Sequence, residues 1–162
     1  MKDKHIYQLI SVLSLICIIF SVIIYVENVQ LSKHQQDFCS AITGAHGCAT
    51  VQSSKYSKIF GISNTIFGMA GFTLLEIFAL LLIFGERKKI KEHRYLKVIK
   101  LLTILGGIIA GLTALAFLYL QTLVIHAYCI FCLFVDASSL IILGLTIYSI
   151  IKIVKLKEIS KK

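Results

Sequence analysis

Four long apolar runs dominate this sequence and constrain its fold more than any other feature. They cover residues 6–26, 66–84, 101–125 and 129–154. An α-helix crosses the hydrocarbon core of a bilayer in about 20 predominantly apolar residues, and each run is long enough to do so. The chain of 162 residues is 57% hydrophobic, so it has too little polar sequence to cover a soluble domain of its size. The sequence therefore predicts an all-α membrane protein with four transmembrane helices.

The first run could instead be a secretory signal peptide, but two features argue against this. Its apolar core is longer than the roughly 7–15 residues that are typical of a signal peptide. In addition, no cleavage site with small residues follows at residues 25–28. We therefore expect residues 1–162 to form a single integral membrane domain with an uncleaved first span.

Positive charge is distributed unevenly among the segments that connect the spans. Residues 85–100 contain seven Lys or Arg residues, and the tail after Ile151 contains five Lys residues. By contrast, residues 27–64 contain three Lys residues against two acidic ones. Because Lys and Arg near span ends stay on the cytoplasmic side, we expect both termini and loop 85–100 to be cytoplasmic. Loop 27–64 is then on the outer face of the cell membrane.

The formal net charge of +9 would also fit a nucleic-acid-binding protein. However, the cations flank the apolar spans, and no aromatic stacking platform or recognition motif lies among them. The charge is therefore explained by membrane orientation, and we expect no nucleic-acid partner.

Four of the five cysteines fall on the predicted outer side. Cys39 and Cys48 lie in the first outer loop, whereas Cys129 and Cys132 open the fourth span after a very short turn. Disulfides persist in this compartment, and two dithiols on one face are typical of a disulfide relay. Cys17 lies inside the first span and is interpreted as a small buried apolar residue.

The spacing of Cys129 and Cys132 has chemical consequences. On a helix, residues three apart share one face, and Cys132 would lie about 4.5 Å deeper along the axis. A Cys-x-x-Cys near a helix N-terminus favours thiolate, because the helix dipole and the free backbone N–H groups stabilise negative charge. The outer sulfur is placed to exchange with a protein thiol, and the inner sulfur is placed to meet a compound dissolved in the bilayer.

Zinc binding and structural disulfides are the alternatives for these cysteines. A zinc site would need a second Cys-x-x-Cys or a close His pair, which the sequence lacks, so we expect no metal. A structural disulfide between Cys129 and Cys132 would close a very short loop and constrain little of the unfolded chain. For Cys39 and Cys48, a structural staple and a redox pair fit the sequence equally well.

Several short strings occur in a fixed order along the chain. They are Phe38-Cys39-Ser40, Cys48, residues 53–62 (SSKYSKIFGI), residues 64–68 (NTIFG) and Cys129-Ile130-Phe131-Cys132. Together with the order of spans and loops, they resemble the vitamin K epoxide reductase family and its bacterial disulfide-forming homologues. The resemblance extends from about residue 6 to residue 151, which is nearly the whole chain.

The resemblance implies a four-transmembrane-helix bundle around a quinone, with an outer cap loop that carries the first cysteine pair. It implies that Cys129 and Cys132 are the redox centre and that Cys39 and Cys48 carry electrons to them from a partner. No thioredoxin-like domain is fused to the sequence, so we expect the partner to be a separate thioredoxin-fold (DsbA-like) protein.

The same resemblance implies that Asn64 and Phe67 contact the quinone ring, with ubiquinone, menaquinone or a vitamin K type as the quinone. Bacterial members often have Pro where Ser63 or Asn64 stands, so this position is closer to the vertebrate pattern. Vertebrate enzymes have Tyr one turn after the second active cysteine, where this chain has Asp136. That difference favours a quinone over vitamin K epoxide as the acceptor.

Two acidic residues lie within the predicted spans, where a charge costs roughly 2.5 kcal/mol or more and usually marks function or pairing. Asp136 follows Cys132 by four residues, on the same helix face, and is a candidate proton relay to the quinone. Glu76 is interpreted as a protonated, hydrogen-bonded carboxyl group. The small residues of Gly107-x-x-x-Gly111 predict a close contact between helices.

The sequence therefore predicts an enzyme, a membrane thiol:quinone oxidoreductase. Electrons from a thioredoxin-fold partner would pass through Cys39 and Cys48 to Cys129 and Cys132, and then to a quinone. One alternative keeps the fold but makes reduction of vitamin K epoxide or quinone the useful reaction. The other is a non-catalytic membrane scaffold with structural outer disulfides.

Overall fold

The computed structural model describes residues 3–31, 47–87 and 93–159. Four long helices make up most of it: α1 (Asp3–Leu31), α4 (Asn64–Arg87), α5 (His93–Tyr119) and α6 (Ile130–Ile159). Each contains a stretch long and apolar enough to cross a membrane, namely His5–Val29, Asn64–Gly85, Tyr95–Ile125 and Ile130–Lys155. The prediction of an all-α membrane protein with four spans is confirmed.

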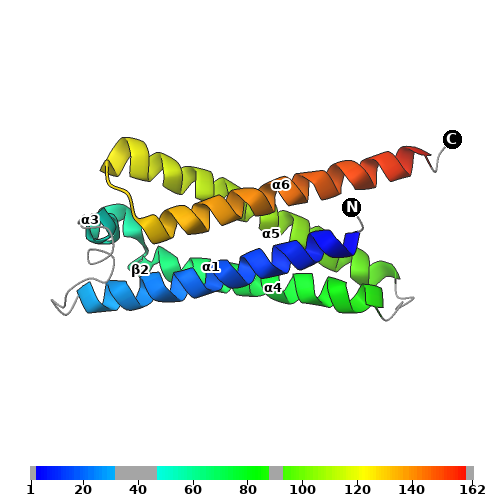
Figure 1. Ribbon diagram of the computed structural model, residues 1–162, viewed down its shortest axis with the longest axis horizontal. Coiled ribbons are helices and arrows are strands. Elements are labelled where there is room, and N and C mark those ends of the chain that lie inside the picture. The colour runs from blue at the N-terminus through cyan, green and yellow to red at the C-terminus, as the bar shows by residue number, and fades with distance from the viewer. Residues whose placement is uncertain (1–2, 32–46, 88–92, 160–162) are drawn as a thin grey trace.

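The four helices form an antiparallel bundle in which consecutive helices are neighbours (Figure 1). α1 packs against α4 and α6, and α5 packs against the same two helices. Of these four helix pairs, α1 with α4 has the largest contact and α4 with α5 the smallest. The termini lie at one end of the bundle, called here the terminal end (Figure 1).

Small elements cover the opposite end of the bundle, called here the cap end. They are α3 (Gly47–Ser53), the 3-10 turn η1 (Lys55–Ser57) and the strands β1 (Lys58–Ile59) and β2 (Ile62–Ser63). The strands form an antiparallel hairpin in which Ile59 lies opposite Ile62. Phe60 and Gly61 connect them with φ angles of 51° and 81°, as a two-residue hairpin turn requires. The hairpin leads directly into α4.

Most of the apolar surface faces outward. Only 22–28% of each span is buried inside the bundle, and large side chains such as Ile109 and Leu112 are exposed. Such a surface fits a lipid environment, where helices associate by close packing because the surrounding lipid is as apolar as their side chains. Cys17 is fully buried in the core with Ile10 and Ile142, as predicted for a small apolar residue.

The helices extend beyond the apolar runs seen in the sequence. α1 continues to Leu31, so Glu27 lies on a helix and is buried, whereas the sequence predicts that it belongs to loop 27–64. α5 begins at His93, inside the segment assigned to loop 85–100. The reason is that helical hydrogen bonding continues past the hydrocarbon core, while Lys97 can extend its charged end toward water from the helix.

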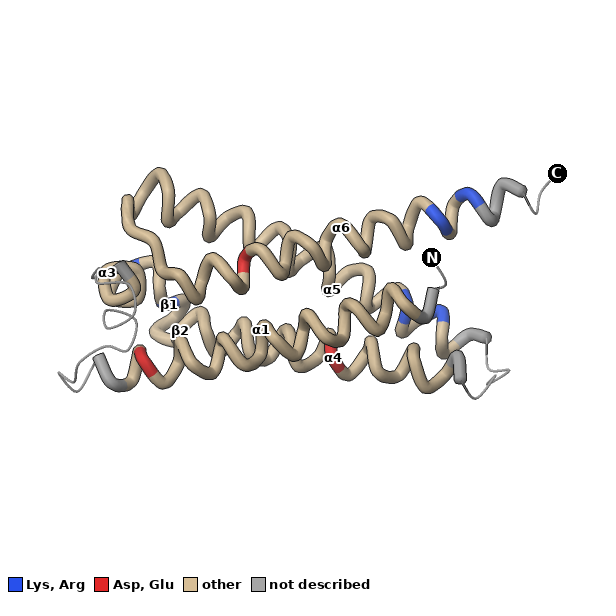
Figure 2. The backbone as a smooth tube through the Cα atoms, in the orientation of Figure 1, with Lys and Arg blue, Asp and Glu red and all other residues tan. Residues whose placement is uncertain are grey.

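The Lys and Arg residues lie near the ends of the bundle (Figure 2). Among the described residues, Lys152 and Lys155 lie on the last turns of α6 at the terminal end. Three acidic residues lie within the four apolar spans, namely Glu27 on α1, Glu76 on α4 and Asp136 on α6. Ser11 of α1 donates a hydrogen bond of 2.7 Å to Oε1 of Glu76, in agreement with the interpretation of Glu76 as a hydrogen-bonded carboxyl group.

α5 and α6 approach each other closely at two glycines of α5. A Cβ atom at Gly111 would lie 2.6 Å from Cβ of Leu143, and one at Gly107 would collide with Oγ1 of Thr146. Real Cβ atoms essentially never approach a neighbour so closely. Gly107-x-x-x-Gly111 is therefore the close helix contact that its small residues predict.

We expect Gly111→Ala to push α5 and α6 apart and to lower the free energy of unfolding by about 1–3 kcal/mol, as overpacking of a filled core does. Thermal unfolding in detergent measures this change. Gly144→Ala is the matched control, because a Cβ at Gly144 meets nothing within 4 Å. Equal stability of the two variants would show that the bundle does not depend on this contact.

Candidate active site

Three of the four cysteines predicted to be redox-active lie together at the cap end. Cys48 on α3, Cys129 just before α6 and Cys132 in the first turn of α6 belong to one cluster. Cys48 and Cys129 are almost completely buried. Cys48 is in a disulfide, whereas Cys129 and Cys132 are free. Cys39 lies outside the described residues.

No group of three His, Cys, Asp or Glu side chains that could hold a metal ion occurs in the described part of the chain.

Cys129 is the N-cap residue of α6. Its carbonyl oxygen accepts the N–H of Leu133 at 3.0 Å, and its sulfur accepts the N–H of Cys132 at 3.4 Å. In most helices, a side-chain oxygen of Ser, Thr, Asp or Asn takes this second role. The hydrogen bond from the Cys132 side chain lowers the pKa of the Cys129 thiol, and burial opposes that effect. The sulfur at the helix start is therefore disposed to be a thiolate.

The chain reaches Cys129 through an irregular turn at the end of α5. α5 continues into a π-helical turn, η2 (Leu120–Ile125), and His126 follows with a left-handed φ of 53°. The main-chain oxygen of Gln121 accepts the N–H groups of both His126 and Ala127. This arrangement reverses the chain and brings Gln121 next to the start of α6.

The side chain of Gln121 connects Cys129 to Asp136. Its Oε1 accepts the main-chain N–H of Cys129 at 3.3 Å, and its Nε2 donates to Oδ2 of Asp136 at 3.1 Å. Gln121 and Asp136 are both buried. Sequence reasoning missed Gln121, although an amide side chain near the end of an apolar run was a signal that could have identified it.

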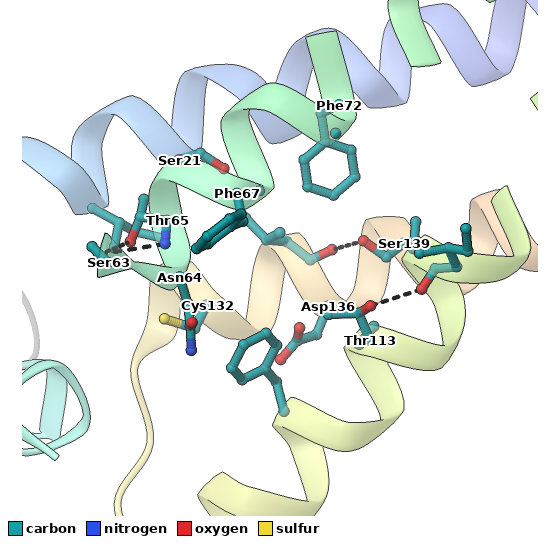
Figure 3. Close-up of a pocket in the computed structure, with 18 of the residues that line it drawn as sticks. Ser21, Ser63, Asn64, Thr65, Phe67, Phe72, Thr113, Cys132, Asp136 and Ser139 are labelled. Carbon is teal, nitrogen blue, oxygen red and sulfur yellow. Dashed lines mark hydrogen bonds between the residues drawn. The ribbon is translucent and has the colours of Figure 1, made fainter. Parts of the chain in front are cut away.

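A cavity of about 650 Å³ adjoins the cysteine cluster. Cys132 and Asp136 of α6 line it, together with Asn64 and Phe67 of α4 (Figure 3). Of the described cysteines, Cys132 alone lines this cavity. The structure therefore brings the two residues expected to contact the quinone ring, the candidate proton relay and one cysteine to a single space.

Asn64 presents an unused polar atom at this space. It is the first residue of α4, and its Nδ2 donates to the carbonyl oxygen of Tyr56 at 2.6 Å. Its Oδ1 is buried and has no hydrogen-bond partner among the described residues. A buried polar atom without a partner is costly, so a ligand in the cavity that donates to Oδ1 would be stabilised.

The cavity lies largely between α4 and α5 and reaches the outer surface of the bundle. Its lining includes Gly71 of α4, where a Cβ would meet nothing within 4 Å. It also includes Leu74, Leu105 and Ile109, and all three are exposed on the surface of the bundle. An elongated apolar molecule could therefore enter the cavity from the lipid side.

Comparison with protein families gives a match over most of the chain. The model of the Vitamin K epoxide reductase family matches residues 8–147. The match begins in α1, ends in α6, and includes the cysteine cluster and the cavity residues. No curated protein and no solved structure matches the chain at the significance level applied to both comparisons.

In the reduced protein, we expect the thiolate of Cys129 to form at a lower pH than an ordinary cysteine thiolate. Cys132→Ala should raise that pH, because it removes the side chain whose hydrogen bond lowers the pKa of Cys129. The ultraviolet absorbance of thiolate during a pH titration measures this, with Cys129→Ala as the background. Cys17→Ala is a control that should leave the midpoint unchanged. An unchanged midpoint in Cys132→Ala would contradict the assigned cause.

Proposed function

Because the chain belongs to the vitamin K epoxide reductase family, we propose that it forms disulfides in other proteins and passes the electrons to a quinone. Members of this family are membrane oxidoreductases with a quinone or vitamin K as electron partner. The observation that carries the proposal is the position of Cys132. Among the described cysteines, Cys132 alone belongs to the cluster with Cys48 and Cys129 and also lines the cavity.

The residues of the cavity fit a quinone. Oδ1 of Asn64, which has no partner among the described residues, can accept a hydrogen bond from a hydroxyl group of the reduced ring. Phe67 is half-exposed on the cavity wall and can pack against an aromatic ring. The opening between α4 and α5 suits an apolar tail that remains in lipid. A bound quinone would supply an acceptor for two electrons and two protons.

The proposed reaction begins outside the membrane with a reduced thioredoxin-fold (DsbA-like) protein. Its thiolate attacks the disulfide of Cys48, for which we propose Cys39 as the second sulfur. Two successive exchanges through a mixed disulfide leave the partner oxidised and both loop cysteines reduced. The electron pair has then moved from the partner to the loop.

The second exchange moves the electron pair from the loop to the Cys129–Cys132 disulfide. A loop thiolate attacks the sulfur of Cys129, and the sulfur of Cys132 leaves as a thiolate. The other loop thiolate then resolves the mixed disulfide, which re-forms the loop disulfide and leaves Cys129 and Cys132 reduced. The common cluster of Cys48, Cys129 and Cys132 supports this route, because thiolate attack needs only access and a good leaving sulfur.

Cys132 and Asp136 have different proposed roles at the cavity. Cys132 would face a quinone bound in the cavity, and formation of the Cys129–Cys132 disulfide from the two thiolates would release the two electrons that this quinone accepts. Asp136 is one turn deeper on the same helix face and is proposed as a proton relay. Gln121 donates to Oδ2 of Asp136, which leaves Oδ1 to hold the proton that is transferred.

We further propose that both termini are cytoplasmic and that the cap end lies outside the cell membrane. The cation-rich tail after Ile151 and the cation-rich segment 85–100 support this orientation, because Lys and Arg near span ends stay in the cytoplasm. The orientation would place α3 and the cysteine cluster in the compartment where a thioredoxin-fold partner could reach them.

Cys129→Ala and Cys132→Ala should each abolish thiol oxidation that depends on a quinone, because each removes one half of the redox centre. In Cys132→Ala, Cys129 should also accumulate in a mixed disulfide with a loop cysteine, which mass spectrometry of unreduced peptides identifies. Cys17→Ala should keep the wild-type rate. Substantial activity in either purified variant would refute the assigned redox centre, whereas a wild-type protein without this activity would favour the scaffold alternative.

Cys48→Ala should stop oxidation of a protein partner, while a small dithiol still reduces Cys129 and Cys132 directly. The measurement compares the rates with a thioredoxin-fold protein and with dithiothreitol. Ser53→Ala is the matched control on α3, because this side chain donates only to the main-chain oxygen of Thr50. If both donors lose activity equally in Cys48→Ala, the disulfide of Cys48 is a structural staple.

A further inference from the structure

Gln121 forms hydrogen bonds with two residues that have different roles in the proposed reaction, namely thiol exchange at Cys129 and proton transfer at Asp136. Its side chain is 2% exposed, and its amide bonds to the main chain of Cys129 and to the carboxyl group of Asp136 at 3.3 Å and 3.1 Å. Cys129 and Asp136 are about two helical turns apart. One amide group on α5 therefore bridges the start of α6 and a carboxyl group deeper in the membrane.

The bridge depends on properties that are particular to a carboxamide. An amide does not titrate, and it offers an acceptor and two donors at a fixed separation. The N–H of Cys129 lies at a helix start, where backbone donors have no partner within the helix, and Cys129 is buried in the protein away from water. An apolar side chain at position 121 would leave this N–H without its acceptor.

The main chain of Gln121 is itself held in place. Its main-chain oxygen accepts the N–H groups of His126 and Ala127, so the residue is fixed at a turn with a defined backbone. It also lines the cavity beside Cys132 and Asp136. The end of α5, the start of α6 and the cavity wall thus meet at this one residue.

We infer that Gln121 is a positioning residue that holds the main chain of Cys129 and the carboxyl group of Asp136 in a fixed relation. The sulfur atoms of Cys129 and Cys132 and the carboxyl group of Asp136 can then act together on a quinone bound in the cavity. This inference rests on the proposed function, which assigns thiol and proton chemistry to these residues. It assigns a role to a residue that contacts neither sulfur atom in the described hydrogen bonds.

Gln121 also affects the redox equilibrium of the cysteine pair. It fixes the residue whose sulfur accepts the N–H of Cys132 when both cysteines are free. Donation to that sulfur stabilises a thiolate, and a stabilised reduced form makes the corresponding disulfide a stronger oxidant. Loss of the amide should therefore shift the equilibrium toward the Cys129–Cys132 disulfide.

The test compares Gln121→Met with Thr122→Val in the full-length protein. Met has nearly the length of Gln and no amide, whereas Thr122 donates only to main-chain oxygens of its own helix. In Gln121→Met, the equilibrium with dithiothreitol should move toward the disulfide by about threefold to tenfold. With dithiothreitol and a soluble quinone analogue, kcat should fall by roughly tenfold or more with little change in the KM for the quinone. Thr122→Val should match the wild type in all three quantities.

Gln121→Leu is the second variant if Gln121→Met does not fold. Leu is apolar and has neither the acceptor for the N–H of Cys129 nor the donor to Asp136, so the redox equilibrium and kcat should shift in the same directions as in Gln121→Met. Wild-type values in a folded Gln121 variant would overturn the inference, and so would equal shifts in Thr122→Val. The equilibrium with dithiothreitol requires no quinone. It therefore tests Gln121 separately, and failure of the wild type to reduce a quinone would overturn the proposed function alone.

Discussion

The hydrogen bonds at the start of α6 are the interaction on which the rest of the site depends. A helix start leaves backbone N–H groups without a partner in the helix, and such a group is costly when it is buried in the protein, as it is at Cys129. Here the side chain of Gln121 accepts the N–H of Cys129, and the sulfur of Cys129 accepts the N–H of Cys132. The atoms that complete the helix therefore also fix the position of the Cys129 sulfur. Capping the helix and stabilising a thiolate coincide here, because the helix needs a hydrogen-bond acceptor for the N–H of Cys132 and the Cys129 sulfur is that acceptor.

The unequal packing of the bundle creates the space that the sulfur pair faces. Gly107 and Gly111 allow α5 to lie against α6, whereas α4 and α5 make the smallest contact of the four neighbouring pairs. The cavity lies largely between α4 and α5 and opens toward lipid. Because small residues permit close approach only where they face a partner, the same helix α5 closes one side of the bundle and leaves another open.

Cys132 connects two environments that are otherwise separate. Toward the cap, it shares a cluster with Cys48 and Cys129, which are both buried. Toward the membrane interior, it lines the cavity with Asn64 and Asp136. A single turn of helix thus separates a region suited to thiol exchange from one suited to a lipid-soluble acceptor. The helical spacing of three residues between the cysteines makes this separation possible.

The sequence by itself determined the four spans, the burial of Cys17, the position of Cys129 at a helix start and the close contact at Gly107 and Gly111. These features follow from apolar length, residue size and spacing, which are local properties of the chain. The family resemblance also selected Asn64 and Phe67, which the structure places at one cavity with Cys132 and Asp136. Only the tertiary structure decided that Cys48 joins the cluster of Cys129 and Cys132, and that Gln121 bridges Cys129 and Asp136. The physical reason is that both depend on how α3 and the π-helical end of α5 pack onto α6, and contacts between distant segments leave no periodic signal in the sequence.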